Sequence, residues 1–310
     1  MSKKYLLYFK QIKMNKDNLS FLKKKFKLIE IENINKIKYL DSKVKDKISI
    51  IYCDPSNYYS GTSLNNFKNL KILASSTTSK GFIDEVYCSK KNIRIFCLEN
   101  EKKFLKTITP TAEHVFGLIL FLTRNYYDAI KSIEKGLFNR RLFGGYAMLS
   151  QLKIGIIGYG RLGKIVKKIA DGFNMKSYIC DIRRKDYKSS LKRLFKNSDI
   201  VTLHIPSKDN LNFFGKKLIK NFKKPFFLIN TSRGDVVDEK LVINLLKNKK
   251  ILGYGTDVLK DEFLPNFQLK KNIIYKNRMK FKIIITPHIG GSTKDAWKRT
   301  EYQVIKKLIY

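Results

Sequence analysis

The feature that most constrains the fold of this chain is a glycine-rich turn between an apolar run and a helical stretch. The turn, Gly-Tyr-Gly-Arg-Leu-Gly at 158–163, follows the apolar run 153–157 and opens a helical segment that ends near Phe173. Glycines at this spacing let a strand turn tightly into a helix. They also let the backbone approach a pyrophosphate, whose charge the helix N-terminus stabilises. The sequence therefore predicts a dinucleotide-binding βαβ unit, with a purely structural glycine turn as the alternative.

An acidic residue supports the dinucleotide hypothesis. Asp181 stands at the end of the next expected strand, where a carboxylate can accept hydrogen bonds from the adenosine ribose hydroxyls. The same carboxylate repels a 2′-phosphate, so we expect NAD as the cofactor in preference to NADP. Arg183 and Arg184 are close enough to offset the acid, which leaves NADP open.

The rest of the chain repeats this kind of alternation. Short runs rich in Ile, Leu, Tyr and Phe alternate with stretches of helical spacing, which indicates a wound α/β architecture. We expect one small parallel sheet with strands near 5–9, 27–31, 48–52, 71–75 and 93–97. A second sheet of six strands is expected near 153–157, 176–180, 199–204, 226–230, 251–255 and 283–286.

The connection between the two sheets is also distinctive. A long apolar helical segment is expected from about Thr111 to Lys131, followed by a glycine-containing arm, 136–150. A final helix at 294–309 is expected to return to the first domain. We therefore predict a first domain of residues 1–106 plus 288–310 and a second domain of residues 107–287.

Composition is consistent with two globular domains. The chain has 310 residues, and its 64 Lys and Arg against 26 Asp and Glu give a formal charge of +38. Such a charge suggests nucleic acid or an anionic membrane. Only eleven of these residues are Arg, however, and the lysines are spread along the whole chain. Because phosphate and base recognition favours the arginine fork, we interpret them as solvated surface charge and expect neither partner.

Cysteine spacing and apolar runs exclude further classes. Cys53, Cys88, Cys97 and Cys180 match neither a zinc motif nor a disulfide framework, so we expect no metal and a reducing cytoplasm. The longest apolar stretch, 115–122, is far shorter than the ~20 residues of a membrane helix.

Three polar stretches that follow strands of the second sheet carry the candidate chemistry. They are 230–239, 255–262 and 286–293, and they supply Arg233, Glu262 and His288. The carboxyl edge of an open α/β sheet is where ligands bind. A guanidinium can hold a carboxylate and a carbonyl, an imidazole can exchange a proton near neutral pH, and a neighbouring carboxylate favours the imidazolium. Together they suit hydride transfer between NADH and a 2-keto acid, although each residue alone could be a cap, a surface charge or a structural histidine.

These stretches resemble a known family. The segments 158–163, 204–206, 230–239, 257–258 and 286–293, with Pro110-Thr111-Ala112-Glu113-His114, are similar to those of the D-isomer-specific 2-hydroxyacid dehydrogenases. The resemblance implies a flavodoxin-like substrate domain and a Rossmann NAD-binding domain, both doubly wound α/β. It also implies that Arg233 binds substrate, that His288 is the acid/base and that Glu262 is its carboxylate partner.

The resemblance extends to the wider site and to assembly. The cofactor would be contacted at Thr78, Gly158, Gly160, Arg161, Leu162, Gly163, Asp181, His204, Ile205, Pro206, Thr231, Ser232, Arg233, Asp257, His288, Gly290 and Gly291. The substrate would be held by Thr77, Thr78, Ser79, Lys80, Arg233 and His288. A homodimer formed through the expected helix 111–131 and the arm 136–150 is implied. The alternatives are an NAD(H)-sensing binding protein of the corepressor type on the same fold and a nucleic-acid-binding protein.

Overall fold

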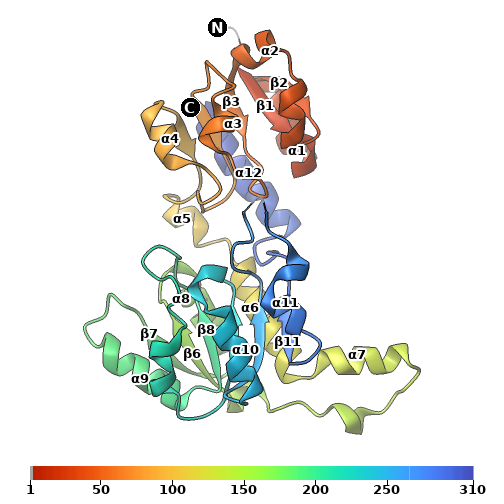
Figure 1. The fold of residues 1–310 in the computed structure, drawn as a ribbon, viewed down its shortest axis with the longest axis vertical. Coiled ribbons are helices and arrows are strands. Elements are labelled where there is room, and N and C mark those ends of the chain that lie inside the picture. Colours follow the sequence, from red (N-terminus) through yellow and green to blue (C-terminus); the bar gives the residue numbers. More distant parts are fainter. Residues whose placement is uncertain (1–2, 265, 310) are drawn as a thin grey trace. The chain divides into compact units, whose positions relative to one another are not determined.

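The computed structural model describes residues 3–264 and 266–309 and divides into two compact units. Of the described residues, unit 1 comprises 3–108, 263–264, 266 and 292–309, and unit 2 comprises 109–262 and 267–291. Each unit is built around its own parallel sheet (Figure 1). Residues 263, 264 and 266 of unit 1 lie within the range 107–287 that we expected for the second domain.

Unit 1 holds a five-stranded parallel sheet in the order β2-β1-β3-β4-β5. The strands are β1 (Tyr5–Phe9), β2 (Lys27–Ile31), β3 (Ile48–Tyr52), β4 (Ile72–Ala74) and β5 (Arg94–Phe96). The helices are α1 (Lys16–Lys25), α2 (Ser42–Lys47), α3 (Gly61–Leu64), α4 (Glu85–Lys90), α5 (Lys102–Leu105) and α12 (Lys294–Ile309). This is the flavodoxin-like strand order, as expected.

Helices cover both faces of this sheet because alternate strand residues are apolar on each side. Leu6, Tyr8 and Ile50 face one way and pack with Leu22 of α1 and Val304 of α12. The opposite face packs against α3, α4 and the 3-10 turn at 34–39. The terminal helix thus completes the core of unit 1, as predicted.

Unit 2 holds a six-stranded parallel sheet in the order β11-β10-β9-β8-β6-β7. The strands are β6 (Lys153–Ile157), β7 (Lys176–Cys180), β8 (Ile200–Leu203), β9 (Phe226–Asn230), β10 (Ile251–Thr256) and β11 (Ile283–Ile285). Helices α6 (Pro110–Thr123) and α8 (Arg161–Gly172) pack on one face. Helices α9 (Tyr187–Asn197), α10 (Glu239–Lys247) and α11 (Ile273–Asn277) pack on the other. The winding reverses between β6 and β8, and such a switch point is where open α/β sheets bind ligands.

The expected single helix over 111–131 is wrong, because two helices occupy the segment. Helix α6 ends at Thr123 and α7 (Tyr126–Glu134) begins after Asn125, whose φ of 55° is left-handed. A left-handed residue cannot continue a right-handed helix. The break lets α7 and the segment after it project away from the sheet of unit 2 (Figure 1).

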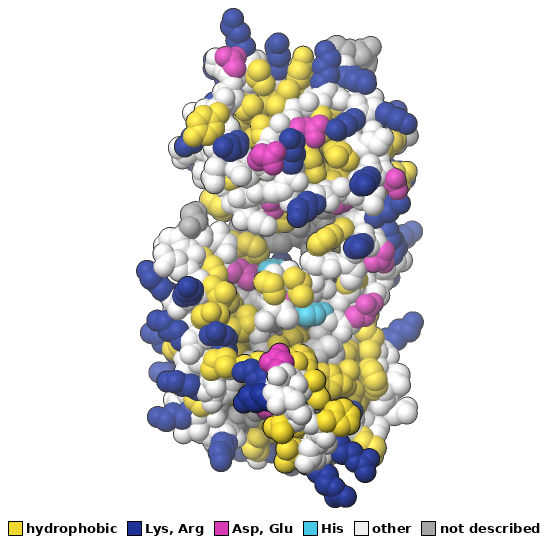
Figure 2. Space-filling model, turned by 90° about the vertical axis from the view of Figure 1, so that its right-hand side faces the viewer, with side chains coloured by type: hydrophobic (Ala, Val, Ile, Leu, Met, Phe, Trp, Pro, Cys, Tyr) yellow, Lys and Arg dark blue, Asp and Glu magenta, His cyan; other side chains and the backbone are white. Residues whose placement is uncertain are grey.

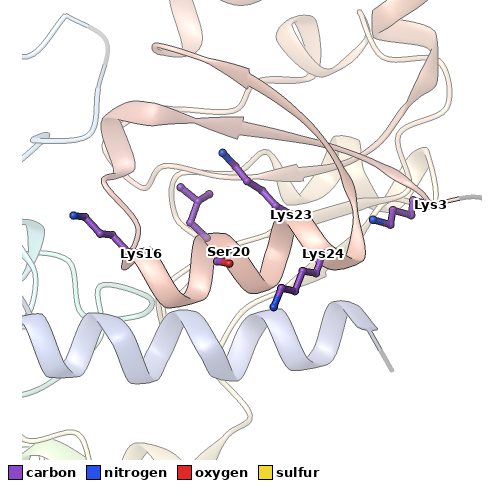
Figure 3. A pocket seen from close by; sticks show the side chains of 6 residues that line it. Lys3, Lys16, Ser20, Lys23 and Lys24 are labelled. Carbon is purple, nitrogen blue, oxygen red and sulfur yellow. The ribbon is translucent and has the colours of Figure 1, made fainter.

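Surface charge is dispersed. Figure 2 shows Lys and Arg side chains scattered over the visible face and not gathered into one stripe. A hollow lies beside α1 in unit 1, lined by Lys3, Lys16, Leu19, Ser20, Lys23 and Lys24 (Figure 3). Lys23 there forms an ion pair with Glu30 at 2.8 Å. No helix among the described residues is long and apolar enough to cross a bilayer.

Candidate active site

The glycine turn lies at the carboxyl end of β6, and its glycines are required by close packing. Gly158 has φ of +91°, and a Cβ there would lie 2.4 Å from the carbonyl oxygen of His204. A Cβ on Gly163 would lie 2.1 Å from the carbonyl oxygen of Gly158. Any side chain at either position would therefore push the turn off the sheet.

The space between this turn and the N-terminus of α8 fits the diphosphate of a dinucleotide. A Cβ on Gly160 would meet no atom within 4 Å, so the space before α8 is open. Helix α8 has no side-chain cap and no acidic residue in its first turn. Its first N–H groups and its dipole are thus suited to an anion.

Asp181 follows β7, and both oxygens of its carboxylate accept hydrogen bonds. Its Oδ1 accepts from the N–H and Nε of Arg183, and its Oδ2 accepts from the N–H of Tyr159 and from Nη2 of Arg183, at 2.7–3.0 Å. These hydrogen bonds, led by those of the Arg183 side chain, hold the pKa of Asp181 well below its ordinary value. The expected ribose acceptor is therefore ionised and paired with a guanidinium whose side chain is 73% exposed.

Two buried polar atoms at the next strand ends lack partners among the described residues. They are Nδ1 of His204, after β8, and Oγ1 of Thr231, after β9. Burial lowers the pKa of His204 to about 4, so its imidazole is neutral, and its Nε2 lies 3.0 Å from Thr202 Oγ1. Unpaired buried polar atoms are costly, so two of them after neighbouring strands at this edge of the sheet fit a polar ligand.

Arg233 is positioned by the turn that follows β9. Asn230 stabilises this turn by donating from Nδ2 to the carbonyl oxygen of Arg233 and by accepting from Ser232. Gly234 brings the turn against the next loop, because a Cβ there would lie 2.0 Å from the carbonyl carbon of Leu259. Burial lowers the pKa of Arg233, and the opposing charges of Glu262 and Asp235 act against that shift.

Glu262 and His288 form a direct pair. Glu262 Oε1 lies 2.7 Å from His288 Nδ1, while its Oε2 accepts from the N–H of Leu259 at 3.0 Å. The second contact fixes the carboxylate against its own loop. Glu239 of α10 stabilises the loop that contains Leu259 and Glu262, because it accepts hydrogen bonds from Lys260 N–H and Asn272 Nδ2. The pair predicted from sequence is thus assembled within unit 2.

Asp257 contacts the turn that carries His288, and only 2% of its surface is exposed. It accepts from the Thr286 hydroxyl and from the N–H groups of Ile289 and Gly290. Burial opposes ionisation, yet these donors and His114 hold the pKa of Asp257 below its ordinary value. Gly290, expected to contact the cofactor, is buried against this carboxylate, whereas Gly291 is exposed.

The loop Thr77–Lys80 belongs to unit 1 and follows β4. Thr77 Oγ1 donates to the carbonyl oxygen of Ser79, and Lys80 forms ion pairs with Glu99 at 2.9 Å and Glu85 at 3.9 Å. Within the described part of the chain, the backbone N–H groups of Thr77, Thr78, Ser79 and Lys80 donate no hydrogen bond. The Lys80 ammonium is engaged, while the backbone of the loop keeps donors for an anion.

His114 and Thr286 were missed as site residues by sequence reasoning. The segment containing His114 was noted only for its resemblance, although a histidine near the start of a helix beside the expected site was the available signal. Among residues 3–264 and 266–309, no group of acidic, His and Cys side chains could hold a metal ion.

A glycine turn at a switch point and an Arg, Glu and His at the carboxyl edge of the same sheet are the arrangement expected of an NAD-dependent oxidoreductase. Comparison with known proteins gives the family. Residues 116–290 match the model for the NAD-binding domain of the D-isomer-specific 2-hydroxyacid dehydrogenases. The chain belongs to that family, and NAD is its cofactor.

Individual relatives agree with this assignment. A glycerate dehydrogenase of Methylorubrum extorquens is 28% identical, over 78% of this chain and 76% of its own. A glyoxylate reductase of Thermococcus litoralis is 31% identical, over 79% of this chain and 75% of its own. Among solved structures, the D-lactate dehydrogenase of Aquifex aeolicus complexed with NAD and lactic acid has a TM-score of 0.74. That structure is 23% identical over 98% of this chain and 94% of its own, and it supports the two-domain fold.

Proposed function

We propose that the chain interconverts a D-2-hydroxy acid and its 2-keto acid, with Arg233, Glu262 and His288 as its catalytic residues. The observation that carries the proposal is the 2.7 Å contact between His288 Nδ1 and Glu262 Oε1, together with the half-buried guanidinium of Arg233, which interacts electrostatically with Glu262. In the reducing direction, bound NADH supplies a hydride to the keto carbon. The keto oxygen takes up a proton, so that the 2-keto acid becomes the 2-hydroxy acid.

The chain's own residues have separate parts in this reaction. The planar donor set of Arg233 binds the substrate carboxylate and polarises the keto group. Nε2 of His288 exchanges the proton with the substrate oxygen. Glu262 stabilises the imidazolium by accepting from Nδ1, which also orients the ring so that Nε2 is the nitrogen that reacts.

The cofactor is proposed to bind across the turn 158–163, with Asp181 at the adenosine ribose and Thr231 and His204 near the rest of the dinucleotide. Open space before α8 and the unpartnered polar atoms of Thr231 and His204 support this. Leu162, Ile205, Pro206, Ser232 and Thr78 remain predicted contacts. Preference for NAD over NADP rests on the ionised Asp181.

Unit 1 is proposed to be the substrate-binding domain, with the loop Thr77–Lys80 binding the substrate carboxylate through its backbone. The unengaged N–H groups of the loop support this role. The ion pairs of Lys80 do not favour a direct contact of its ammonium with substrate.

A homodimer is proposed through α7 and the arm after it. These segments expose Ile130 (53%), Ile133 (56%), Phe138 (95%) and Leu142 (63%), an apolar surface unusual for a monomer. The described cysteines are all free and buried, which fits a reducing compartment such as the cytoplasm.

The direct test of the activity uses NADH with 3-phosphohydroxypyruvate, hydroxypyruvate, glyoxylate and pyruvate, each supplied to the purified chain. We expect NADH absorbance to fall with at least one of them. If no keto acid in the panel is reduced, with NADH or with NADPH, the proposal is contradicted. The relatives' names favour the enzyme over the NAD(H)-sensing alternative.

A further inference from the structure

His114 lies in the first turns of α6 and has no part in the chemistry proposed above. Its side chain is 20% exposed, and its Nε2 lies 2.9 Å from Thr286 Oγ1 and 3.5 Å from Asp257 Oδ1. His114 thus lies next to the carboxylate of Asp257, which contacts the turn that carries His288.

The direction of these hydrogen bonds follows from the number of available hydrogens. A threonine hydroxyl has one hydrogen, and that of Thr286 points to Asp257 Oδ1 at 2.6 Å. The 2.9 Å contact with His114 therefore requires the hydroxyl oxygen to accept and Nε2 of His114 to donate. His114 must carry its proton on Nε2.

The Asp257 carboxylate transmits this contact to the turn that carries His288. Its Oδ1 accepts from Ile289 N–H at 2.9 Å and its Oδ2 from Gly290 N–H at 2.7 Å. The ring of His114 also lies near the turn, because a Cβ built on Gly290 would be 3.6 Å from His114 Cδ2.

The turn needs such support because His288 has an unfavourable backbone conformation. Its φ is 54°, in the left-handed region that non-glycine residues adopt only when the surroundings hold them there. Its own N–H donates to the carbonyl oxygens of Asp257 and Thr286. The backbone N–H groups of His288, Ile289 and Gly290 therefore donate to Asp257 and Thr286, which form a cluster with His114.

We propose that His114 is a positioning residue for His288. By donating from Nε2 to Thr286, it orients the hydroxyl toward Asp257, and the carboxylate then holds the strained turn from which the imidazole reaches the substrate. The inference rests on the proposed role of His288 and extends it to a residue on a different element.

Kinetic measurements on variants test whether the hydrogen bonds from His114 through Thr286 to Asp257 position His288. His114→Leu removes the donor, His114→Gln keeps an N–H donor at similar reach, and Thr286→Val removes the hydroxyl while keeping the side-chain shape. Loss of a hydrogen bond to a charged network predicts a ~10- to 100-fold lower kcat for His114→Leu and Thr286→Val, with KM for NADH nearly unchanged. His114→Gln should recover most of the activity.

The double variant His114→Leu/Thr286→Val shows whether the two residues act through one hydrogen-bond network or lower kcat independently. Residues in one network are not additive, so the double variant should be about as slow as the slower single variant. Additive losses, a His114→Leu enzyme with normal kcat, or a His114→Gln enzyme as slow as His114→Leu would each overturn the proposal.

A spectroscopic readout keeps the test independent of turnover. The chain has three histidines, so single substitutions assign every imidazole in a long-range ¹H–¹⁵N spectrum. We expect His114 to carry a proton on Nε2 and the His288 signals to move in both His114→Leu and Thr286→Val. An Nδ1–H tautomer, or His288 signals that stay in place, would overturn the proposal even if no keto acid is reduced. Inactivity toward every keto acid with the expected spectra would instead count against the proposed function alone.

Discussion

At the level of single residues, the proposed reaction depends on the proton that His288 exchanges with the substrate oxygen. Replacing it with Asn removes the acid/base while keeping a polar side chain of similar size. We expect His288→Asn to lower kcat by ~10²- to 10⁴-fold, because that is the usual contribution of a positioned acid/base. NADH affinity, measured by fluorescence titration, should stay nearly the same. Unchanged turnover would mean that another group exchanges the proton.

Arg183 should influence the choice of cofactor. Its guanidinium neutralises Asp181, whose charge would otherwise repel a 2′-phosphate. We expect Arg183→Ala to raise the NADH to NADPH ratio of kcat/KM about 10-fold, in line with loss of a charge-assisted hydrogen bond. The matched control is Arg184→Ala, because Arg184 pairs with Asp186 instead. Equal ratios in wild type and Arg183→Ala would contradict the expectation.

His204 should make stability depend on pH. Its pKa is about 4 in the folded chain and 6.5 when exposed, so between these values the unfolded chain binds more protons. The stabilisation is complete above pH 6.5 and is lost as the pH falls toward 4, by about 1.4 kcal/mol per pH unit at most. Urea titrations across this window should show a steeper loss for wild type than for His204→Gln. Parallel curves would show that His204 is not buried in its neutral form.

At the scale of elements, Gly160 and Gly163 separate cofactor binding from folding. A Cβ on Gly163 collides with the backbone of Gly158, so Gly163→Ala should cost about 1–3 kcal/mol of stability and weaken NADH binding. Gly160 has φ of −76° and open space around it. Gly160→Ala should therefore keep the wild-type Tm, while NADH affinity falls about 10-fold because the methyl narrows the space before α8. Calorimetry and NADH titration of both variants check this, and full NADH affinity in Gly160→Ala would contradict the placement.

The positions of the strands could be predicted from sequence far better than those of the helices in the segment 111–131. Strands buried on both faces are continuous apolar runs, and β1 to β11 lie within a residue or two of the expected ranges. The break at Asn125 was missed because apolar residues continue through Ile130 and Ile133 at helical spacing. A single left-handed residue leaves no trace in such a pattern.

For the candidate site residues, the sequence predicted the edge of the sheet at which they lie but not their contacts with one another. Arg233, Glu262 and His288 come after strands, so their common edge follows from the parallel topology. Their contacts depend on how loops far apart in the chain pack together. The Asp181–Arg183 pair and the approach of His114 to Asp257 needed side-chain positions, which no spacing rule supplies.

At the level of the whole molecule, α7 should control assembly. Ile130 and Ile133 lie on one exposed face of α7, and burying them against a second copy would remove apolar surface from water. We expect wild type to sediment as a dimer and Ile130→Glu/Ile133→Glu as a folded monomer. Lys135→Glu, at the end of the same helix, is the charge control and should stay dimeric. A monomeric wild type, or a dimeric double variant, would contradict the proposed interface.

The most direct test of the whole account follows the hydride itself. The purified chain is mixed with NADH deuterated at the transferred position and with the keto acid panel, and the product is analysed by mass spectrometry and chiral chromatography. The account predicts a D-2-hydroxy acid carrying one deuterium on the carbon that bore the keto group. A product without deuterium, an L product, or no product from any keto acid would contradict it.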